Sequence, residues 1–172
     1  MHRTLIAGLA LSALAQSVSA QAISSQKCLS VPQAEALVTY LLPTAVQASR
    51  DKCAASLPVT AHLLKKNSEQ LAKYRAASEG AWPQAKNAVS VLAGEKLPPE
   101  LDDTLLRPIA DAMFTNLIRE EIKPKDCALI AKIYQDLEPM PSSNLASLAI
   151  SIVQAATKDD KKQDIPICKA PS

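Results

Sequence analysis

The four cysteines constrain this chain more than any other feature. They are far apart in the 172-residue sequence, and the last stands in a short tail, DIPICKAPS. Their positions are Cys28, Cys53, Cys127 and Cys168. An even number of cysteines in an exported protein indicates disulfide bonds, whereas cytosolic cysteines more often bind metals or act in catalysis. What the cysteines do therefore depends on where the chain folds.

The first twenty residues have the layout of a secretory signal peptide. Arg3 supplies a positive charge, residues 5–15 are almost wholly apolar, and a Val-Ser-Ala sequence follows at the cleavage spacing. The apolar run is too short to span a bilayer, which takes about 20 residues. We therefore predict a signal peptide over residues 1–20. The mature chain is expected to be periplasmic or secreted, in a Gram-negative bacterium by the style of the signal.

Export places all four cysteines in an oxidising environment, so we predict two disulfide bonds. A zinc site is disfavoured, because no two cysteines have C-x-x-C spacing and His62 is the only histidine after residue 20. A catalytic cysteine is disfavoured because oxidation would consume the thiol. Four cysteines allow three pairings, and the spacing alone does not select one.

Expected helix lengths favour Cys28–Cys53 and Cys127–Cys168. The turn EPMPSSN is short, so its flanking helices should be antiparallel neighbours, which would return the tail to Cys127. The first pair requires a sharp turn at Leu42-Pro43, because an unbroken helix of about 20 residues would hold its ends roughly 30 Å apart, far beyond disulfide reach. The two crossed pairings stay open.

Residue usage favours helix throughout the mature chain. Only Gly80 and Gly94 remain after cleavage, good helix formers are plentiful, and no segment shows the alternation of a strand. Most prolines stand where a helix would start or stop. We predict one all-α domain over residues 21–172, a compact bundle of about six or seven short helices with irregular, orthogonal packing and two disulfide staples.

Local signals mark where these helices begin and end. Ser30 and Gln33 have the spacing of a capping box, and Gly94 suits the residue after a helix. Gly80 is expected to close one helix before another starts at Trp82, and Pro108 is expected to kink or break a helix near Leu106. The last helix, residues 144–157, has an apolar face broad enough to be central in the core.

Residues that could carry chemistry do not form a recognisable site. His62 has no nucleophile-elbow motif beside it. Adjacent residues on a helix point about 100° apart, so neighbouring acids cannot form a facing catalytic pair. We therefore predict no catalytic residue, no metal site and no cofactor. The acid pairs are Asp102-Asp103, which should cap a helix, Glu120-Glu121 and Asp159-Asp160.

Charge excludes some partners. Without Arg3 the 19 basic residues become 18, against 17 acidic ones, so the mature chain is nearly neutral. A nearly neutral chain is not expected to bind nucleic acid or an anionic membrane. Trp82 is a candidate anchor for a protein partner if its indole is exposed, and a buried indole under the turn is the alternative.

Together these features favour a non-catalytic protein-binding or accessory module of the periplasm or extracellular space. The expected partner is another protein of that compartment, and the mature chain has no predicted transmembrane segment. One alternative is a carrier of a small apolar ligand between the helices. A further alternative is an enzyme with an unrecognised site. The oligomeric state is left open.

Overall fold

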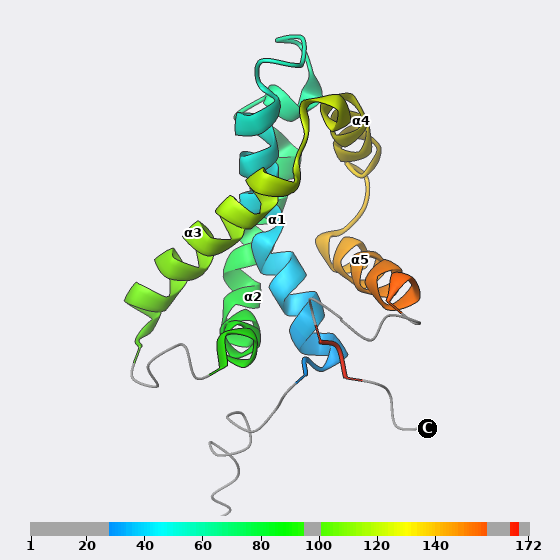
Figure 1. Ribbon diagram of the computed structural model, residues 1–172. Coiled ribbons are helices and arrows are strands. Elements are labelled where there is room, and N and C mark those ends of the chain that lie inside the picture. The colour runs from blue at the N-terminus through cyan, green and yellow to red at the C-terminus, as the bar shows by residue number, and fades with distance from the viewer. Residues whose placement is uncertain (1–27, 95–100, 158–165, 169–172) are drawn as a thin grey trace, which may run out of the picture.

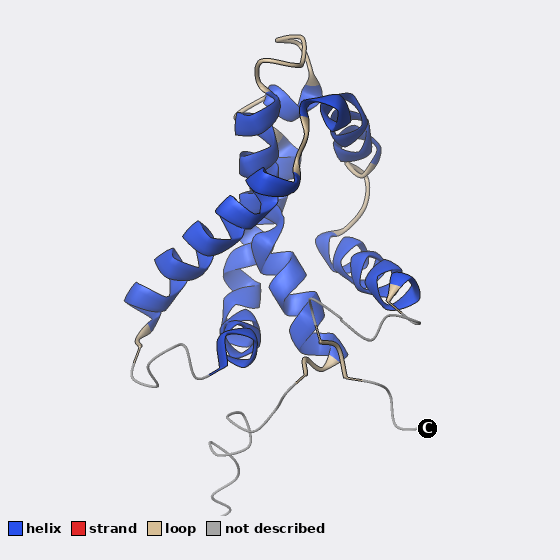
Figure 2. Cartoon of the chain, in the orientation of Figure 1, coloured by secondary structure: helices blue, strands red, loops and turns tan. Residues whose placement is uncertain are grey.

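The computed structural model describes residues 28–94, 101–157 and 166–168. These ranges hold five α-helices, two single-turn 3₁₀ helices and one isolated β-bridge, with no longer strand (Figure 2). The predicted all-α class is confirmed, although the helices are fewer and longer than expected. The predicted signal peptide and the Asp159-Asp160 pair lie outside the described residues.

The central helix is α1, Val31–Cys53. It begins at the predicted capping box, in which Ser30 Oγ accepts the Gln33 amide and Gln33 Oε1 accepts the Ser30 amide. The prediction of a hairpin at Leu42-Pro43 is wrong, because α1 continues through Pro43. Proline removes one backbone hydrogen bond at a cost of about 3 kcal/mol. Burial on both sides of it outweighs that loss, each large apolar side chain contributing about 1.5–3 kcal/mol.

The next long helix, α2, spans Glu69–Ala93 and runs back alongside α1 (Figure 1). The sequence predicted two helices divided at Gly80, but α2 continues through both Gly80 and Pro83. Small residues on its buried side, among them the fully buried Ala85, allow close approach to α1 over the whole length. Packing along the length of α1 therefore keeps α2 continuous despite local breakers.

The segments that flank α2 are a 3₁₀ turn before it and a glycine after it. Before α2 the chain forms a 3₁₀ turn, η1, at His62–Leu64. The predicted end of α2 is confirmed, because Gly94 adopts a φ of 54°, which glycine accepts without strain.

The third helix, α3, spans Asp103–Glu121 and packs on α1. Its predicted cap is confirmed, since Asp102 accepts the amides of Thr104 and Leu105. No break occurs at Pro108, which lies early in the helix, so the carbonyl that loses its partner belongs to the first turn.

The C-terminal half holds η3, Pro124–Asp126, α4, Cys127–Asp136, and α5, Ser142–Ala156. The expectation that α4 and α5 form an antiparallel pair is wrong. Instead, α4 packs mainly on η1 and α5 mainly on α1 (Figure 1). The fully central helix is thus α1, whereas α5 buries only Ala146 and Ile150.

The buried side chains gather at two places along α1. One cluster surrounds its first half and includes Leu37, Tyr40, Trp82 and Ile150. The other surrounds its second half and joins α1, α2, η1 and α4 around Leu71. The continuous α1 therefore contributes to both clusters.

All four cysteines are paired, but the favoured pairing is wrong: the bonds are Cys28–Cys168 and Cys53–Cys127. Because α1 is continuous, its 23 residues separate the first two cysteines by about 35 Å. Cys53 instead meets the start of α4, and the tail returns to the start of α1. There Leu29 and Ile167 form a parallel bridge.

Candidate interaction surface

A second apolar row on α3 is the most unusual surface feature. One row, containing Leu106 and Ala110, is buried against the core. Beside it lies a row at four-residue spacing that the fold leaves open: Leu105 is 57% exposed, Ile109 47%, Met113 41% and Leu117 52%. We call these four residues the α3 row. Single exposed leucines are ordinary, but a continuous row along three helical turns indicates an interaction site.

The helices α4 and α5 also expose large apolar side chains. Leu129 and Ile133 of α4 are 61% and 47% exposed, and Leu148 and Ile152 of α5 are 43% and 58% exposed. In addition, α5 carries no charged residue. Depletion of charge is a compositional property of interface centres. The three helices α3, α4 and α5 therefore all expose apolar side chains, and α5 does so without any charge of its own.

Several charged side chains beside these faces are paired within the chain. Lys86 lies 3.3 Å from Asp103, and Lys132 lies 2.7 Å from Asp136. Arg107 of α3 reaches Glu79 of α2 at 2.9 Å. Such exposed pairs add little stability. They do neutralise the start of the α3 row and part of the border of the α4 face.

An aromatic and cationic cluster fixes α3 to the two long helices. Trp82 and Tyr40 have ring centroids 4.8 Å apart. The Arg107 guanidinium lies over both rings, 5.1 Å from the centre of Trp82 and 5.6 Å from that of Tyr40. The Tyr40 hydroxyl donates to Asp111 at 2.6 Å. Burial, followed by the neighbouring Asp111 carboxylate, raises the pKa of Tyr40. Held by these contacts, α3 presents its open row rigidly.

The candidate anchor Trp82 is only 7% exposed. Of the two alternatives, the structure therefore has the buried indole. Its Nε1 atom has no hydrogen-bond partner among the described residues. A contact between Trp82 and a partner remains a prediction, and it would require the cluster around it to open.

His62 belongs to the contact between η1 and α4. Its Nε2 atom lies 3.7 Å from Glu138 Oε1, and its ring packs on Tyr134 with centroids 5.5 Å apart. The nearby Ser68 hydroxyl shares a hydrogen bond with the Tyr134 hydroxyl instead, at 3.0 Å, and also caps α2. These contacts hold secondary-structure elements together.

The acid pairs within the described residues lie apart from one another. Asp102 caps α3, where the Thr104 hydroxyl and then the Leu105 amide lower its pKa. Asp103 pairs with Lys86, and Glu120-Glu121 is exposed at the other end of α3. Among the described residues, no three His, Cys, Asp or Glu side chains come close enough to hold a metal ion.

The sequence analysis missed the α3 row as a surface. Its four members are aliphatic, as is the buried Leu106 beside them, so residue type does not show which of them face the core. A signal was present in their spacing. Together the two rows occupy more of the helix circumference than one packing contact covers, and a helix with that pattern on one face of a bundle must leave part of it open.

Comparison with protein-family models, with curated proteins and with solved structures finds no match to this chain. Within the described ranges, no helix is at once long and apolar enough to cross a membrane. The two disulfides fit an oxidising compartment outside the cytosol.

Proposed function

We propose that this chain is an exported, non-catalytic helical module that binds another protein through the α3 row. The observation that carries this proposal is the row itself, with four half-exposed aliphatic side chains on a helix whose other apolar row is already packed. Burying such side chains against a partner gives the main favourable term in protein association.

The geometry of the row favours an apolar, uncharged helix face as the partner surface. From Leu105 to Leu117 the row covers twelve residues, or about 18 Å along the axis. Side chains repeating every fourth residue form a ridge that fits the groove of another helix. The charges of Arg107 and Asp103 near the start of the row already have partners in this chain, so a partner need not supply compensating charge at that end.

The row supports a modest affinity by itself. Fully burying one such side chain contributes about 1.5–3 kcal/mol, and here roughly half of each is still exposed. Four residues would then supply about 3–6 kcal/mol, before the cost of association is subtracted. A partner that also covers the apolar side chains of α4 or α5 would bind more tightly. Nothing among the described contacts favours the carrier or the enzyme alternative, and both stay untested.

Site-specific photo-crosslinking tests the proposal. A photo-reactive residue is placed at Met113 in the α3 row and, in a matched control, at the exposed Arg75 of α2. After expression with its own leader in the native host, we expect a discrete protein adduct from position 113 and none from position 75. The substitution Ile109→Glu in the same chain should abolish the adduct without lowering stability, because Ile109 is half exposed. Equal adducts at both positions, or no protein adduct at position 113, would contradict the proposal.

A further inference from the structure

The exposed side of α3 is uncharged along the whole α3 row. Both charged residues within this stretch, Arg107 and Asp111, are partly buried, and they are paired with Glu79 and with the Tyr40 hydroxyl. Between the first and last members of the row, the other exposed positions are Pro108, Ala112 and Asn116. A partner helix on this face would meet mostly apolar surface, and it would use its own backbone amides internally.

Met113 is the one member of the α3 row whose side chain can be oxidised. Its thioether is flexible and polarisable, which suits a side chain to an adaptable interface, and the residue is 41% exposed. Oxidation to the sulfoxide converts this apolar side chain into a polar one. Once the predicted signal peptide is removed, the only other methionine is Met140. It is less exposed and lies between α4 and α5, outside the row.

A sulfoxide at position 113 would act on docking rather than on folding. In the free protein its oxygen can face solvent, and the packing that holds α3 on the core comes from Leu106 and Ala110 on the buried side. Between two apolar helix faces the same oxygen would be an acceptor without a donor. Burying an unpaired acceptor should weaken binding roughly tenfold or more.

We propose that Met113 is an oxidation-sensitive position in the α3 row, at which a peroxide lowers the affinity for the partner. The inference rests on the proposed function of the row. The thioether sulfur attacks one oxygen of hydrogen peroxide, the O–O bond breaks and an S–O bond forms. Sulfur loses two electrons to the peroxide, and the proton of the new S–OH group passes to the released hydroxide, which leaves as water. A bound partner covers the sulfur and protects it from this reaction.

Peroxide treatment of the purified, folded protein tests how accessible the sulfur is. The protein is exposed to hydrogen peroxide for successive times and mapped by mass spectrometry. We expect Met113 to gain one oxygen about twofold faster or more than Met140, because it is the more exposed. The urea midpoint should stay unchanged after oxidation. Slower oxidation of Met113 than of Met140, or unfolding on oxidation, would overturn the inference.

Photo-crosslinking from Leu117, the next member of the row, tests the effect on docking. The full chain with a photo-reactive residue at this position is expressed in the native host and compared with and without hydrogen peroxide. Peroxide should reduce the protein adduct roughly tenfold or more. In Met113→Leu, which conserves volume and cannot be oxidised in this way, the ratio of adduct with and without peroxide should stay near one. The control Met140→Leu should respond to peroxide as the original chain does.

The outcomes separate this inference from the proposed function. An adduct that persists after Met113 is shown to be oxidised would overturn the inference and leave the proposed function intact. An equal loss of adduct in Met113→Leu would also overturn it, because peroxide would then act elsewhere. Absence of an adduct from the untreated chain would instead refute the proposed function, and the inference with it.

Discussion

Replacing one or the other disulfide by a pair of serines tests whether chain entropy or burial has the larger effect on the free energy of unfolding. The variant Cys28→Ser/Cys168→Ser keeps an inner loop with a sequence separation of 74, whereas Cys53→Ser/Cys127→Ser keeps an outer loop with a separation of 140. The longer loop restricts the unfolded chain more. By entropy alone, Cys53→Ser/Cys127→Ser, which keeps the Cys28–Cys168 bond, should therefore be the more stable variant.

The size of that entropic advantage is small. The chain-entropy relation makes it 1.5RT times the logarithm of the ratio of the loop lengths, or about 0.6 kcal/mol. Burial acts in the opposite direction. A serine at position 53 places a hydroxyl in a fully buried apolar cluster, and an unpaired buried hydroxyl costs about 1–3 kcal/mol. A serine at position 127 is less costly, because the Lys123 carbonyl lies 3.9 Å from the sulfur it replaces.

Burial should therefore outweigh loop entropy, and Cys53→Ser/Cys127→Ser should be the less stable variant by about 1–2 kcal/mol. Urea unfolding followed by far-ultraviolet circular dichroism measures the difference. The matched variants with alanine remove the hydroxyl and should narrow the gap, leaving the cost of the cavity. If Cys28→Ser/Cys168→Ser proved equally or less stable, the reasoning from burial would fail.

Three further substitutions test particular contacts. Arg50→Met should cost about 2–4 kcal/mol in the free energy of unfolding, because the buried guanidinium donates to the carbonyls of Leu63 and Lys65. The rate of hydrogen exchange around η1 should rise in the same variant, and an unchanged rate there would show that Arg50 does not hold η1 on α1. Ser30→Ala should cost about 1 kcal/mol by removing the cap of α1, measured by urea unfolding, with Ser30→Asp as the control that keeps an acceptor. Asp102 has a pKa lowered below its ordinary 3.8, so its contribution to stability is present above that value and lost as the pH falls through the lowered pKa. Asp102→Asn should therefore flatten the acid side of the stability profile between about pH 5 and pH 2, and an unchanged slope would count against it.

Local chemistry allowed the helix ends to be predicted from the sequence. Ser30, Asp102 and Gly94 act through atoms within three residues of themselves, as acceptors of backbone amides or as a position with positive φ. Such interactions depend little on the rest of the fold. The same locality explains why the all-α class could be predicted from residue usage alone.

The continuity of the long helices could not be predicted in this way. Pro43, Pro83 and Pro108 each remove one backbone hydrogen bond, which is a local cost. The compensating stabilisation comes from side chains of the same helices, such as Tyr40 on α1 and Ala85 on α2, which pack against other helices. Because the gain is tertiary, a sequence pattern that includes only the cost predicts breaks that do not occur.

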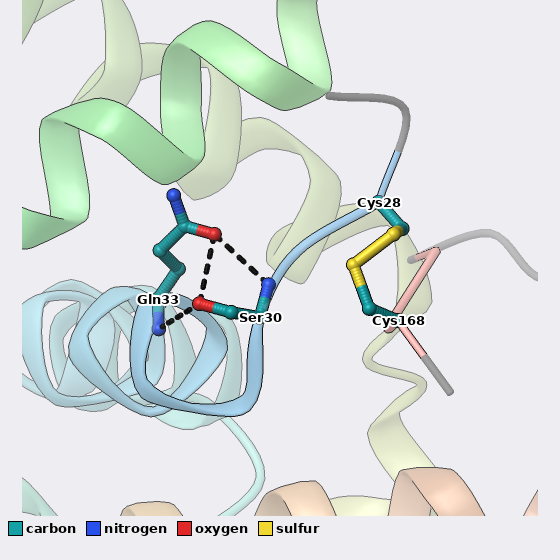
Figure 3. The surroundings of a disulfide bond; sticks show 4 residues. All are labelled: Cys28, Ser30, Gln33 and Cys168. Atoms are coloured by element: carbon teal, nitrogen blue, oxygen red, sulfur yellow. Dashed lines mark hydrogen bonds between the residues drawn. A yellow bond between two sulfur atoms is a disulfide. The ribbon is translucent and has the colours of Figure 1, made fainter. Parts of the chain in front are cut away.

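The wrong cysteine pairing followed from the expected antiparallel contact between α4 and α5. That contact brought the tail to Cys127, left Cys53 for Cys28, and so required a hairpin at Pro43. Because α1 is continuous, its start and its end are far apart, and each is held by its own disulfide. Cys53–Cys127 joins the end of α1 to the start of α4 inside a buried cluster. Cys28–Cys168 joins the residues before α1 to the C-terminal residues, and both of its cysteines are partly exposed (Figure 3). The difference in burial between the two bridges is therefore a consequence of one helix continuing through one proline.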